Sequence, residues 1–394
     1  TSGMYHYVTE FEDHSREGIL HYAIDLYEPL FYEEGLSTVV TVAKNVDSDN
    51  LWLANNGKVD ASTTSDMPTQ ILCSLLPVMY TDDPEDVLLI GLASGITGGA
   101  LTQVPAIQDL DIVELEPAIE RAARFFGEYN HHVLDDPRVD LIANDGRNHL
   151  LMTPPGTYDL IVSEPSNPWI TGVSNLFTRE FWEMGKKRLK PGGIWSQWVQ
   201  MYGMDDRDLR TLLATFATVY PHVIVYSTIA DSDLVLIGSE EPLDPGELTA
   251  LGLFAQGSVR AELARVDVDD PYDLIAMFQM DRASILEHTR GAPLNTDDNM
   301  RIEYRAPLNL HRSTHAENMR FLSEAAAMPE AAMRGHGDWI QLARAYERRD
   351  DRARSLAAYA RAIQTSTGET REMYKAESRD ALVRAREALN EEEE

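Results

Sequence analysis

Short apolar runs alternate with stretches of helical spacing through the middle of the chain. Seven runs have the length and composition of strands: Val87–Ile90, Leu110–Glu114, Val139–Ala143, Tyr158–Ser163, Gly193–Trp198, Val223–Ser227 and Leu234–Gly238. Helical patterns lie between most of them, and Lys190–Gly193 predicts a helix stop and a tight turn. This alternation predicts an α/β fold with a mainly parallel sheet and helices on both faces. The last two runs leave no room for a helix, so we expect those strands to pair antiparallel.

The N-terminal part has a different pattern. Residues 14–32 predict a short helix and an entry segment. Leu36–Ala43 and Leu51–Ala54 are rich in β-formers and are separated by turn residues, which predicts a small antiparallel β-unit. Asp66–Tyr80 has helical spacing, with Pro68 tolerated in the first turn.

The composition changes to Ala, Arg and Glu after about Pro307. Apolar positions between Trp339 and Ala362 have the spacing of one tetratricopeptide-like (TPR-like) helix pair, and a plain helical hairpin is the alternative. A single pair cannot bury its own apolar face, so we expect it to pack on the core domain or on a partner. The chain is therefore divided into residues 1–80 (helix and β-hairpin unit), 81–306 (α/β domain) and 307–394 (helical extension with an acidic tail at 391–394).

The charge balance excludes one class of function. The chain has 34 basic and 65 acidic residues, which gives a formal net charge of −31. A basic face for nucleic acid is therefore not expected, and an acidic, solvated surface is the simplest interpretation. Attraction of a cationic substrate would require a local acidic pocket, which the net charge does not predict.

Cys73 is the only cysteine, and it lies in an apolar run. We expect a buried structural thiol and a reducing compartment, the cytoplasm. The sequence has no apolar run long enough to cross a bilayer. Because it begins at Thr1 without a methionine, an upstream membrane segment is an alternative that would place this part at the cytoplasmic face of a membrane.

Candidate chemistry begins with the stretch Asp86–Glu116. Its pattern is a buried strand, a glycine-rich turn, a helix and a second strand ending in acid, as in the nucleotide-binding half of a doubly wound α/β domain. Gly91 and Gly95 allow a tight turn beside a ligand, and Glu114 can accept hydrogen bonds from ribose hydroxyls. The spacing G-x-x-x-G-x-x-G suits a nucleoside without pyrophosphate, such as S-adenosylmethionine (SAM), with a dinucleotide site as the alternative. Seven strands with the last antiparallel favour the Rossmann-like sheet of SAM-dependent transferases.

Two further acids follow predicted strands, Asp145 after the third and Glu164 after the fourth. Ligands of open α/β sheets bind beyond the carboxyl ends of the strands, so Glu114, Asp145 and Glu164 together indicate a site. Each of these acids alone is more often a helix cap or a turn residue. Glu116 alternates with Glu114 and is expected to cap the following helix instead.

Nine segments carry a recognisable pattern. They are NGKVDASTTSDMPTQ (56–70), VLLIGLASGITGG (87–99), VELEPA (113–118), DDPRV (135–139), NDGRNHL (144–150), YDLIVSEPSNPW (158–169), NLFTREFWE (175–183), LKPGGIWSQW (189–198) and NTDDNMRIEY (295–304). With them the chain resembles the spermidine synthase (aminopropyltransferase) family, in particular its long bacterial members that are often fused to membrane segments. The resemblance covers about Leu36 to Ala306. It implies a polyamine-biosynthesis enzyme that forms dimers or tetramers and uses decarboxylated SAM and a small amine, without a metal.

For the donor, the resemblance implies that Glu114 holds the ribose of decarboxylated SAM and that Asp145 and Gly146 hold its adenine amino group. The family has an Asp at the position of Ser94, which contacts the aminopropyl end of the donor. A serine at this position leaves room for the carboxylate of intact SAM. The expected cofactor-binding residues are Gly91, Ser94, Gly95, Glu114, Asp145 and Gly146.

For the acceptor, the family carries two aspartates in the loop after the fourth strand: one helps to deprotonate the attacking amine, and one binds the amine. Glu164 and Asn167 stand at these positions, and Asn167 cannot pair with a cation. A Tyr-His pair of the family corresponds to Thr69 and Gln70, and a Gln corresponds to Asp60. The expected acceptor-binding residues are Asp60, Gln70, Asn167, Trp169 and Tyr202. These departures predict an acceptor other than plain putrescine.

The predicted reaction is a direct displacement, in which a neutral amine attacks a carbon next to the sulfonium. Glu164 is the expected catalytic base, with apolar walls such as Trp169 raising its pKa. Transfer of an aminopropyl group is the first hypothesis. The alternatives are a SAM-dependent methyltransferase of the same fold and a non-catalytic nucleoside-binding module.

Overall fold

The computed structural model describes Ser15, Gly18 and residues 25–392 apart from Asp82, Thr171 and Asp231. Its contacts form two compact units, one of Thr1–Leu243 with Met280–Ala326 and one of Asp244–Gln279 with Ala327–Glu394. The helix expected within residues 14–32 falls almost entirely outside the described residues. The domain boundaries at residues 80 and 306 stay predictions.

A small antiparallel sheet opens the first unit. Its strands, in spatial order, are β1 (Tyr27–Glu34), β2 (Val39–Asn45), β3 (Leu51–Asn55) and β4 (Lys58–Ser62). The predicted antiparallel β-unit is confirmed, and it is larger than expected. β1 includes the end of the expected entry segment, and β4 follows the turn at Asn56 and Gly57.

The large sheet has the order β12-β10-β11-β9-β8-β5-β6-β7. Its strands are β5 (Asp86–Ile90), β6 (Asp109–Glu114), β7 (Val139–Ala143), β8 (Tyr158–Ser163), β9 (Leu189–Gln200), β10 (His222–Ile229), β11 (Asp233–Ser239) and β12 (Phe278–Asp281). β5 to β9 are parallel, and β11 is antiparallel to both of its neighbours. All seven predicted strands are therefore confirmed. β12 adds an eighth that the sequence did not predict, because its four residues are too few to show a period.

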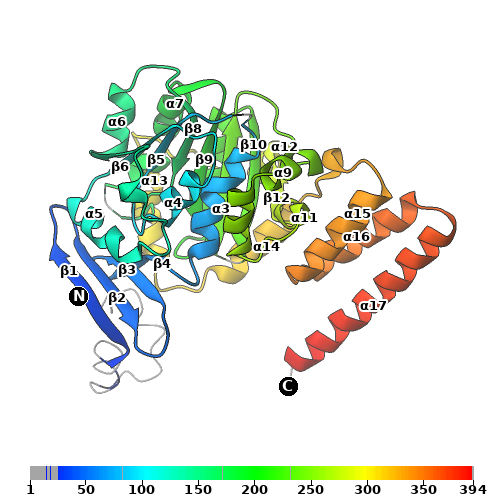
Figure 1. Cartoon of the computed structure of the whole chain (residues 1–394). Coiled ribbons are helices and arrows are strands. Elements are labelled where there is room, and N and C mark those ends of the chain that lie inside the picture. Colours follow the sequence, from blue (N-terminus) through cyan, green and yellow to red (C-terminus); the bar gives the residue numbers. More distant parts are fainter. Residues whose placement is uncertain are drawn as a thin grey trace. The chain divides into compact units, whose positions relative to one another are not determined.

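Helices cover the sheet on both sides (Figure 1). In the first unit they are α3 (Met67–Val78), α4 (Ile96–Thr102), α5 (Pro117–Ala123), α6 (Gly146–Met152), α7 (Arg179–Lys186), α8 (Asp206–Val219), α12 (Arg282–His288), α13 (Arg301–Arg305) and α14 (His315–Ala325). Large buried rings fill the space between sheet and helices, such as Trp182, which meets Phe216 edge-on at 5.0 Å between ring centroids. Cys73 on α3 is buried, as expected.

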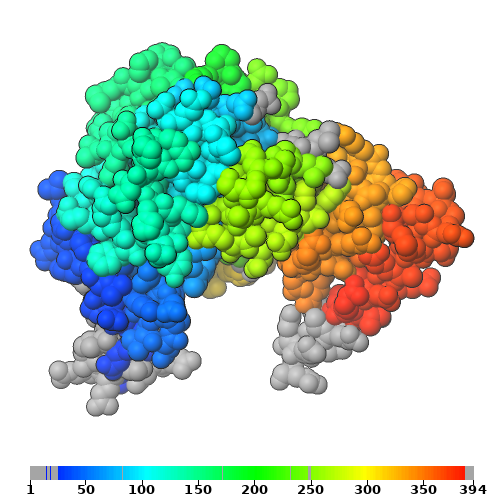
Figure 2. All heavy atoms as spheres, in the orientation of Figure 1, coloured from blue at the N-terminus to red at the C-terminus, as the bar shows by residue number. Residues whose placement is uncertain are grey.

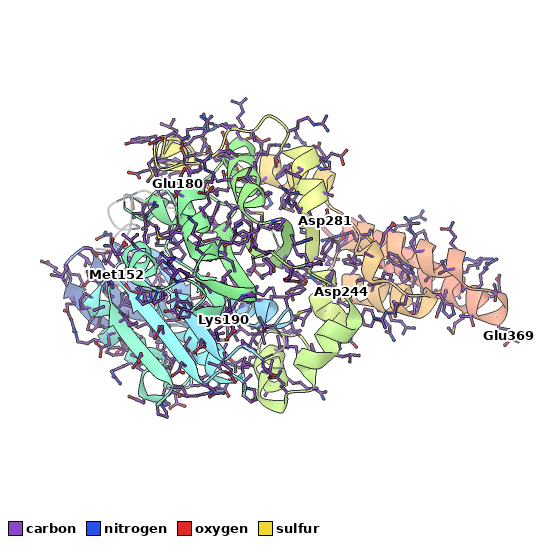
Figure 3. The ribbon with its side chains drawn as sticks, turned by 90° about the horizontal axis from the view of Figure 1, so that it is seen from above. Met152, Glu180, Lys190, Asp244, Asp281 and Glu369 are labelled. Carbon is purple, nitrogen blue, oxygen red and sulfur yellow. The ribbon has the colours of Figure 1, made fainter. Side chains whose placement is uncertain are left out.

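The turn predicted at Lys190–Gly193 lies within β9, where it forms a bulge. Tyr158 and Leu160 of β8 pair with Leu189 and Ile194, so the intervening residues of β9 are displaced from the ladder. Lys190, labelled in Figure 3, pairs through Nζ with Asp86 at 2.5 Å and Asp159 at 2.8 Å. These ion pairs join β5, β8 and β9 at the amino-terminal edge of the parallel strands, opposite the edge where ligands bind.

The small sheet packs on the large domain through α5 (Figure 2). Glu116 caps α5 by accepting a hydrogen bond from the Ala118 amide, which confirms the role expected for it. The same carboxylate accepts a hydrogen bond from the Ser37 amide at 2.8 Å, beside the start of β2. Glu116 therefore caps a helix of the large domain and also binds the backbone beside the small sheet.

The second unit is helical. It contains α9 (Glu247–Phe254), α10 (Gly257–Ala264), α11 (Pro271–Ala276), α15 (His336–Arg348), α16 (Arg352–Thr365) and α17 (Gly368–Glu392). α15 and α16 are the helix pair expected from the spacing, and α17 takes up the first two residues of the acidic tail. Arg348 on α15 pairs with Asp273 on α11, and Arg344 pairs with Glu377 on α17. The pair is therefore covered by α11 and α17 of its own unit.

In the described part of the chain, none of the helices combines the length and the apolar character that a membrane span requires.

Candidate active site

The loops that leave β5 and β8 meet at the carboxyl edge of the sheet. β5 lies between β6 and β8, and the chain moves from β5 to one side and later returns on the other, which makes this the switch point of the topology. Gly91 follows β5 with φ of +100°, and a Cβ at this position would lie 2.7 Å from the carbonyl oxygen of Glu164. Glycine is required because both the backbone angle and the approach exclude a side chain.

Glu114 lies at the end of β6, beside the glycine-rich loop. Its two carboxylate oxygens accept hydrogen bonds from the Leu92 amide at 3.0 Å and the Glu116 amide at 2.9 Å. Burial raises its pKa, and these backbone donors oppose that effect. The amides of Leu115 and Ala93 act in the same direction, so the chain surrounds this carboxylate with four backbone donors.

Asp145 and Gly146 lie at the next strand end, after β7. Asp145 caps α6 by accepting a hydrogen bond from the Asn148 amide at 2.8 Å. A Cβ on Gly146 would lie 2.6 Å from Ile90 Cγ2, so this backbone packs directly on β5. The assignment of Gly91, Gly95, Glu114, Asp145 and Gly146 to a nucleoside stays a prediction.

A cavity of about 70 Å³ opens beside Glu164, at the switch point. Small-molecule sites usually measure ~300–1,000 Å³, so this cavity is too small to hold a whole nucleoside. The predicted site residues that line it are Asp60, Gln70, Gly91, Glu164 and Tyr202. The lining residues to which the sequence assigned no role include Asp66, Thr97, Trp198 and Asp233.

Glu164 is the most strongly perturbed acid of this cavity. Burial raises its pKa to about 8, and the negative charges of Asp233 and Asp66 add to the rise. The Thr97 hydroxyl donates a hydrogen bond to Glu164 Oε2 and lowers the pKa in part. At neutral pH the group is mainly protonated, and its conjugate base is a stronger proton acceptor than an ordinary carboxylate.

Asp233, at the start of β11, is the principal residue that sequence reasoning missed. Its side chain is buried, and its Oδ2 accepts a hydrogen bond from the Thr69 hydroxyl at 2.9 Å. Burial raises its pKa to about 6. In the sequence Asp233 stands between two adjacent strands, where an Asp is ordinarily a turn residue. Asp66, before α3, similarly has the position of a helix cap.

Asp60 lies on β4 and is already paired within the chain. Lys58 Nζ lies 2.8 Å from Asp60 Oδ1, and both side chains are buried. Lys58 and Asp60 are two residues apart on one strand, so they share a face, and this alternation is the signal by which the sequence could have shown the pair. The Lys58 ammonium also lies 5.6 Å from the centre of the Tyr202 ring.

Seven predicted residues do not line the cavity: Ser94, Gly95, Glu114, Asp145, Gly146, Asn167 and Trp169. Ser94 is buried, and its hydroxyl donates a hydrogen bond to Gln70 Oε1. Asn167 and Trp169 lie against Tyr202: the Asn167 amide is 3.4 Å from the Tyr202 hydroxyl, and the Trp169 ring meets Tyr202 edge-on. Ser94, Asn167 and Trp169 therefore contact residues that line the cavity.

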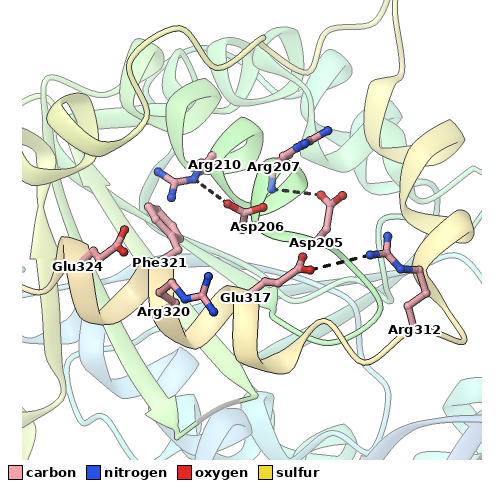
Figure 4. Close-up of a pocket in the computed structure, with 9 residues that line it drawn as sticks. All are labelled: Asp205, Asp206, Arg207, Arg210, Arg312, Glu317, Arg320, Phe321 and Glu324. Atoms are coloured by element: carbon pink, nitrogen blue, oxygen red, sulfur yellow. Dashed lines mark hydrogen bonds and ion pairs between the residues drawn. The ribbon is translucent and has the colours of Figure 1, made fainter.

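A second cavity of about 360 Å³ lies between α14 and the start of α8 (Figure 4). It is lined by Asp205, Asp206, Arg207, Arg210, Arg312, Glu317, Arg320, Phe321 and Glu324. Several of these charges pair with one another, as Arg210 does with Asp206 at 3.2 Å. Because its acidic and basic side chains balance, it favours neither a cation nor an anion, and we place the candidate site at the smaller cavity.

The described residues include no group of three or more His, Cys, Asp and Glu side chains arranged to hold a metal ion.

The strand order, with antiparallel β11 between β9 and β10, is that of the SAM-dependent transferase class. Residues 70–230 match the family model described as "Spermine/spermidine synthase domain". This part of the chain is therefore similar to the spermine/spermidine synthase domain.

Similar proteins with curated names include transferases of two kinds. Putrescine N-methyltransferase 1 of Nicotiana tabacum is 27% identical over 175 residues, which cover 44% of this chain and 46% of the relative. Polyamine aminopropyltransferase 2 of Pseudomonas aeruginosa is 27% identical over 199 residues, which cover 50% of this chain and 56% of the relative. The chain thus spans about half the length of these relatives.

Solved structures are also similar to this chain. The crystal structure of a probable spermidine synthase from Corynebacterium glutamicum aligns with a TM-score of 0.49 at 19% identity, covering 68% of this chain and 96% of that one.

Proposed function

We propose that this protein transfers an aminopropyl group from decarboxylated SAM to an amine. The observation that carries the proposal is the set of acids around the cavity: Glu164, Asp66 and Asp233 converge at the switch point of a spermidine synthase-like sheet. Lys58 compensates Asp233 only in part, since the pKa of Asp233 stays raised to about 6. An ammonium group is the ligand chemistry that such a cluster favours.

The reaction needs one base and one aligned pair of reactants. The amine nitrogen attacks the carbon that is bonded to the sulfonium, the C–S bond breaks, and its electron pair stays on sulfur to give methylthioadenosine. The proton released by the nitrogen passes to the Glu164 carboxylate. Thr97 holds that carboxylate at the cavity through the hydrogen bond to Oε2.

The acids favour decarboxylated over intact SAM. The tail of decarboxylated SAM carries only an ammonium, whereas intact SAM adds a carboxylate that Asp66 and Asp233 would repel if the tail entered the cavity. Methyl transfer from intact SAM is the second candidate. It is supported by the relatives named putrescine N-methyltransferase and by Ser94, whose family counterpart is an Asp.

The two reactions release different nucleosides, which provides the test. The purified chain is incubated with a panel of amines and either donor, and the nucleoside products are separated by chromatography. Methylthioadenosine from decarboxylated SAM is the expected product. S-adenosylhomocysteine alone would establish the methyl transfer, and the absence of both nucleosides across the panel would contradict the proposal.

We also propose a homo-oligomer in a reducing cytoplasm. The family resemblance supports a dimer or tetramer, and the single buried cysteine supports a reducing compartment. Sedimentation equilibrium would show a single species of twice or four times the chain mass, and a monomer at micromolar concentration would contradict the oligomer.

A further inference from the structure

Asp60 has its hydrogen-bonding capacity filled by the chain itself. Oδ1 accepts from Lys58 Nζ at 2.8 Å and lies 3.0 Å from the Ser166 hydroxyl. Oδ2 accepts from Asn55 Nδ2 at 2.8 Å and lies 2.9 Å from the same hydroxyl. A carboxylate offers about four acceptor positions, so little capacity remains for a ligand cation.

Lys58 is held firmly in this place. It is 8% exposed, and Tyr202 adds its ring face and its hydroxyl, whose oxygen lies 3.4 Å from Nζ. An ion pair in such surroundings is stabilising only while both partners are present, because either charge alone would be buried and uncompensated. The positive charge therefore stays beside Asp60, which lines the cavity.

The acids that line the cavity differ in how they are compensated. Asp60 is paired with the buried Lys58, and the Lys58 charge also lowers the pKa of Asp233 in part. Burial raises the pKa of Glu164, and the charges of Asp233 and Asp66 add to the rise. Asp60 therefore offers a ligand cation no free carboxylate and places another cation beside it.

We propose that Lys58 occupies the place beside Asp60 that a second substrate ammonium would otherwise take. The acceptor is then an amine with a single ammonium and an uncharged far end. The inference rests on the proposed transfer to an amine. It names Lys58 as a specificity-determining residue, which acts by repulsion of diamines.

The test compares butylamine with 1,4-diaminobutane, two acceptors of equal chain length. The wild-type protein is expected to use butylamine with the higher kcat/KM. Lys58→Met keeps the length of the side chain and removes its charge, so the ratio of kcat/KM for the diamine to that for the monoamine should rise roughly tenfold or more. Lys44→Met is the matched control, because Lys44 pairs with Asp49 on an exposed part of the small sheet, and it should leave the ratio unchanged.

A binding measurement separates this inference from the proposed function. Lys58→Met leaves Asp60 buried without its cation, so the Tm should fall, and 1,4-diaminobutane should restore more of it than butylamine does. The double variant Lys58→Met/Asp60→Asn should lose this preference. If no amine gives methylthioadenosine, the proposed function fails while the Tm comparison still decides the charge of the site. A wild-type preference for the diamine, or an unchanged ratio in Lys58→Met, would overturn the inference.

Discussion

The position of Glu164 in the fold determines its chemistry more than its residue type does. A Glu after a strand is common, but this carboxyl lies at a switch point, is buried, and faces two further acids. Burial and the two neighbouring acids both disfavour the charged form. The result is a group whose pKa of about 8 lies near the working range of a base that accepts a proton from an amine.

Replacing this carboxyl should separate chemistry from binding. Glu164→Gln should lower kcat by at least ~100-fold, the usual loss when a general base is removed, and should leave the dissociation constant for methylthioadenosine within a few-fold of wild type. Stopped-time assays and calorimetry measure the two quantities. Glu128→Gln is the matched control on a side chain that is 92% exposed. Undiminished turnover in Glu164→Gln would remove this residue as the base.

The pH dependence of the reaction follows from the same pKa. Only the deprotonated carboxyl accepts a proton, so kcat/KM should rise as the pH approaches and passes about 8. Ionisation of the amine substrate contributes to the profile, so it should be compared for two amines of different pKa. A component near pH 8 that is common to both amines is the expected result, and a flat profile between pH 6 and 9 would contradict it.

Stability should show the opposite trend with pH. The pKa of Glu164 is raised from 4.5 to about 8 on folding, so the folded state holds the proton more tightly than the unfolded state. This contribution is complete below pH 4.5 and is lost as the pH rises through about 8. The side chain of Glu164→Gln cannot ionise. The free energy of unfolding of this variant should therefore rise relative to that of the wild type between these pH values, by up to a few kcal/mol. Urea titrations at pH 5 and pH 8.5 measure the difference, and an equal difference at both would contradict the shift.

At the scale of elements, the site depends on two loops that can touch because one residue lacks a side chain. Gly91 combines a positive φ with the close approach of the Glu164 carbonyl. Gly156 also has a positive φ, of +68°, but a Cβ there would meet nothing within 4 Å. The two glycines therefore separate backbone strain from steric contact.

Alanine at these positions should have unequal effects. Gly156→Ala should cost about 1 kcal/mol of unfolding free energy, the price of a positive φ for alanine. Gly91→Ala should cost ~3 kcal/mol or more and should abolish turnover, because β5 and β8 must also move apart. Chemical denaturation with an activity assay tests both, and equal costs would show that the approach of the loops is unimportant.

The elements also show where sequence reasoning succeeds. Runs such as Val139–Ala143 and Tyr158–Ser163 were predicted with their observed bounds, because an apolar strand bounded by turn residues is a local signal. β12 and β4 were missed, since a short strand is defined by its neighbours and not by its own period. The bulge in β9 is predicted as a turn from the residues Lys190–Gly193. Gly192 does have a positive φ of +78°, but the strand continues beyond it.

At the scale of the whole molecule, the net charge of −31 has a consequence of its own. Like charges repel in the folded state, and salt screens this repulsion over a Debye length that falls from about 10 Å at 0.1 M to about 3 Å at 1 M. The Tm should therefore rise by several degrees between ~0.05 and ~1 M NaCl. Differential scanning calorimetry measures the change, and a Tm that falls with salt would mean that the ion pairs outweigh the repulsion.

The sequence by itself determined the order of strands and helices, the antiparallel last pair and the acids that follow strand ends. These features depend on residues that are close together in the sequence, so periodicity and turn chemistry predict them. Glu164 was found in this way, as were Glu114 and Asp145.

Only the tertiary structure decided which side chains meet. Two strands, β9 and β10, lie between Glu164 and Asp233 in the sequence, and Asp233 lines the cavity because β11 is inserted between those two strands in the sheet. Burial, which raises both pKa values, likewise exists only after the chain has packed. The alternation along β4 predicts that Lys58 and Asp60 share a face. The burial of this ion pair, however, exists only in the folded chain. Contacts and dielectric environment are properties of the folded chain, and they bring Glu164, Asp66 and Asp233 together and pair Asp60 with Lys58.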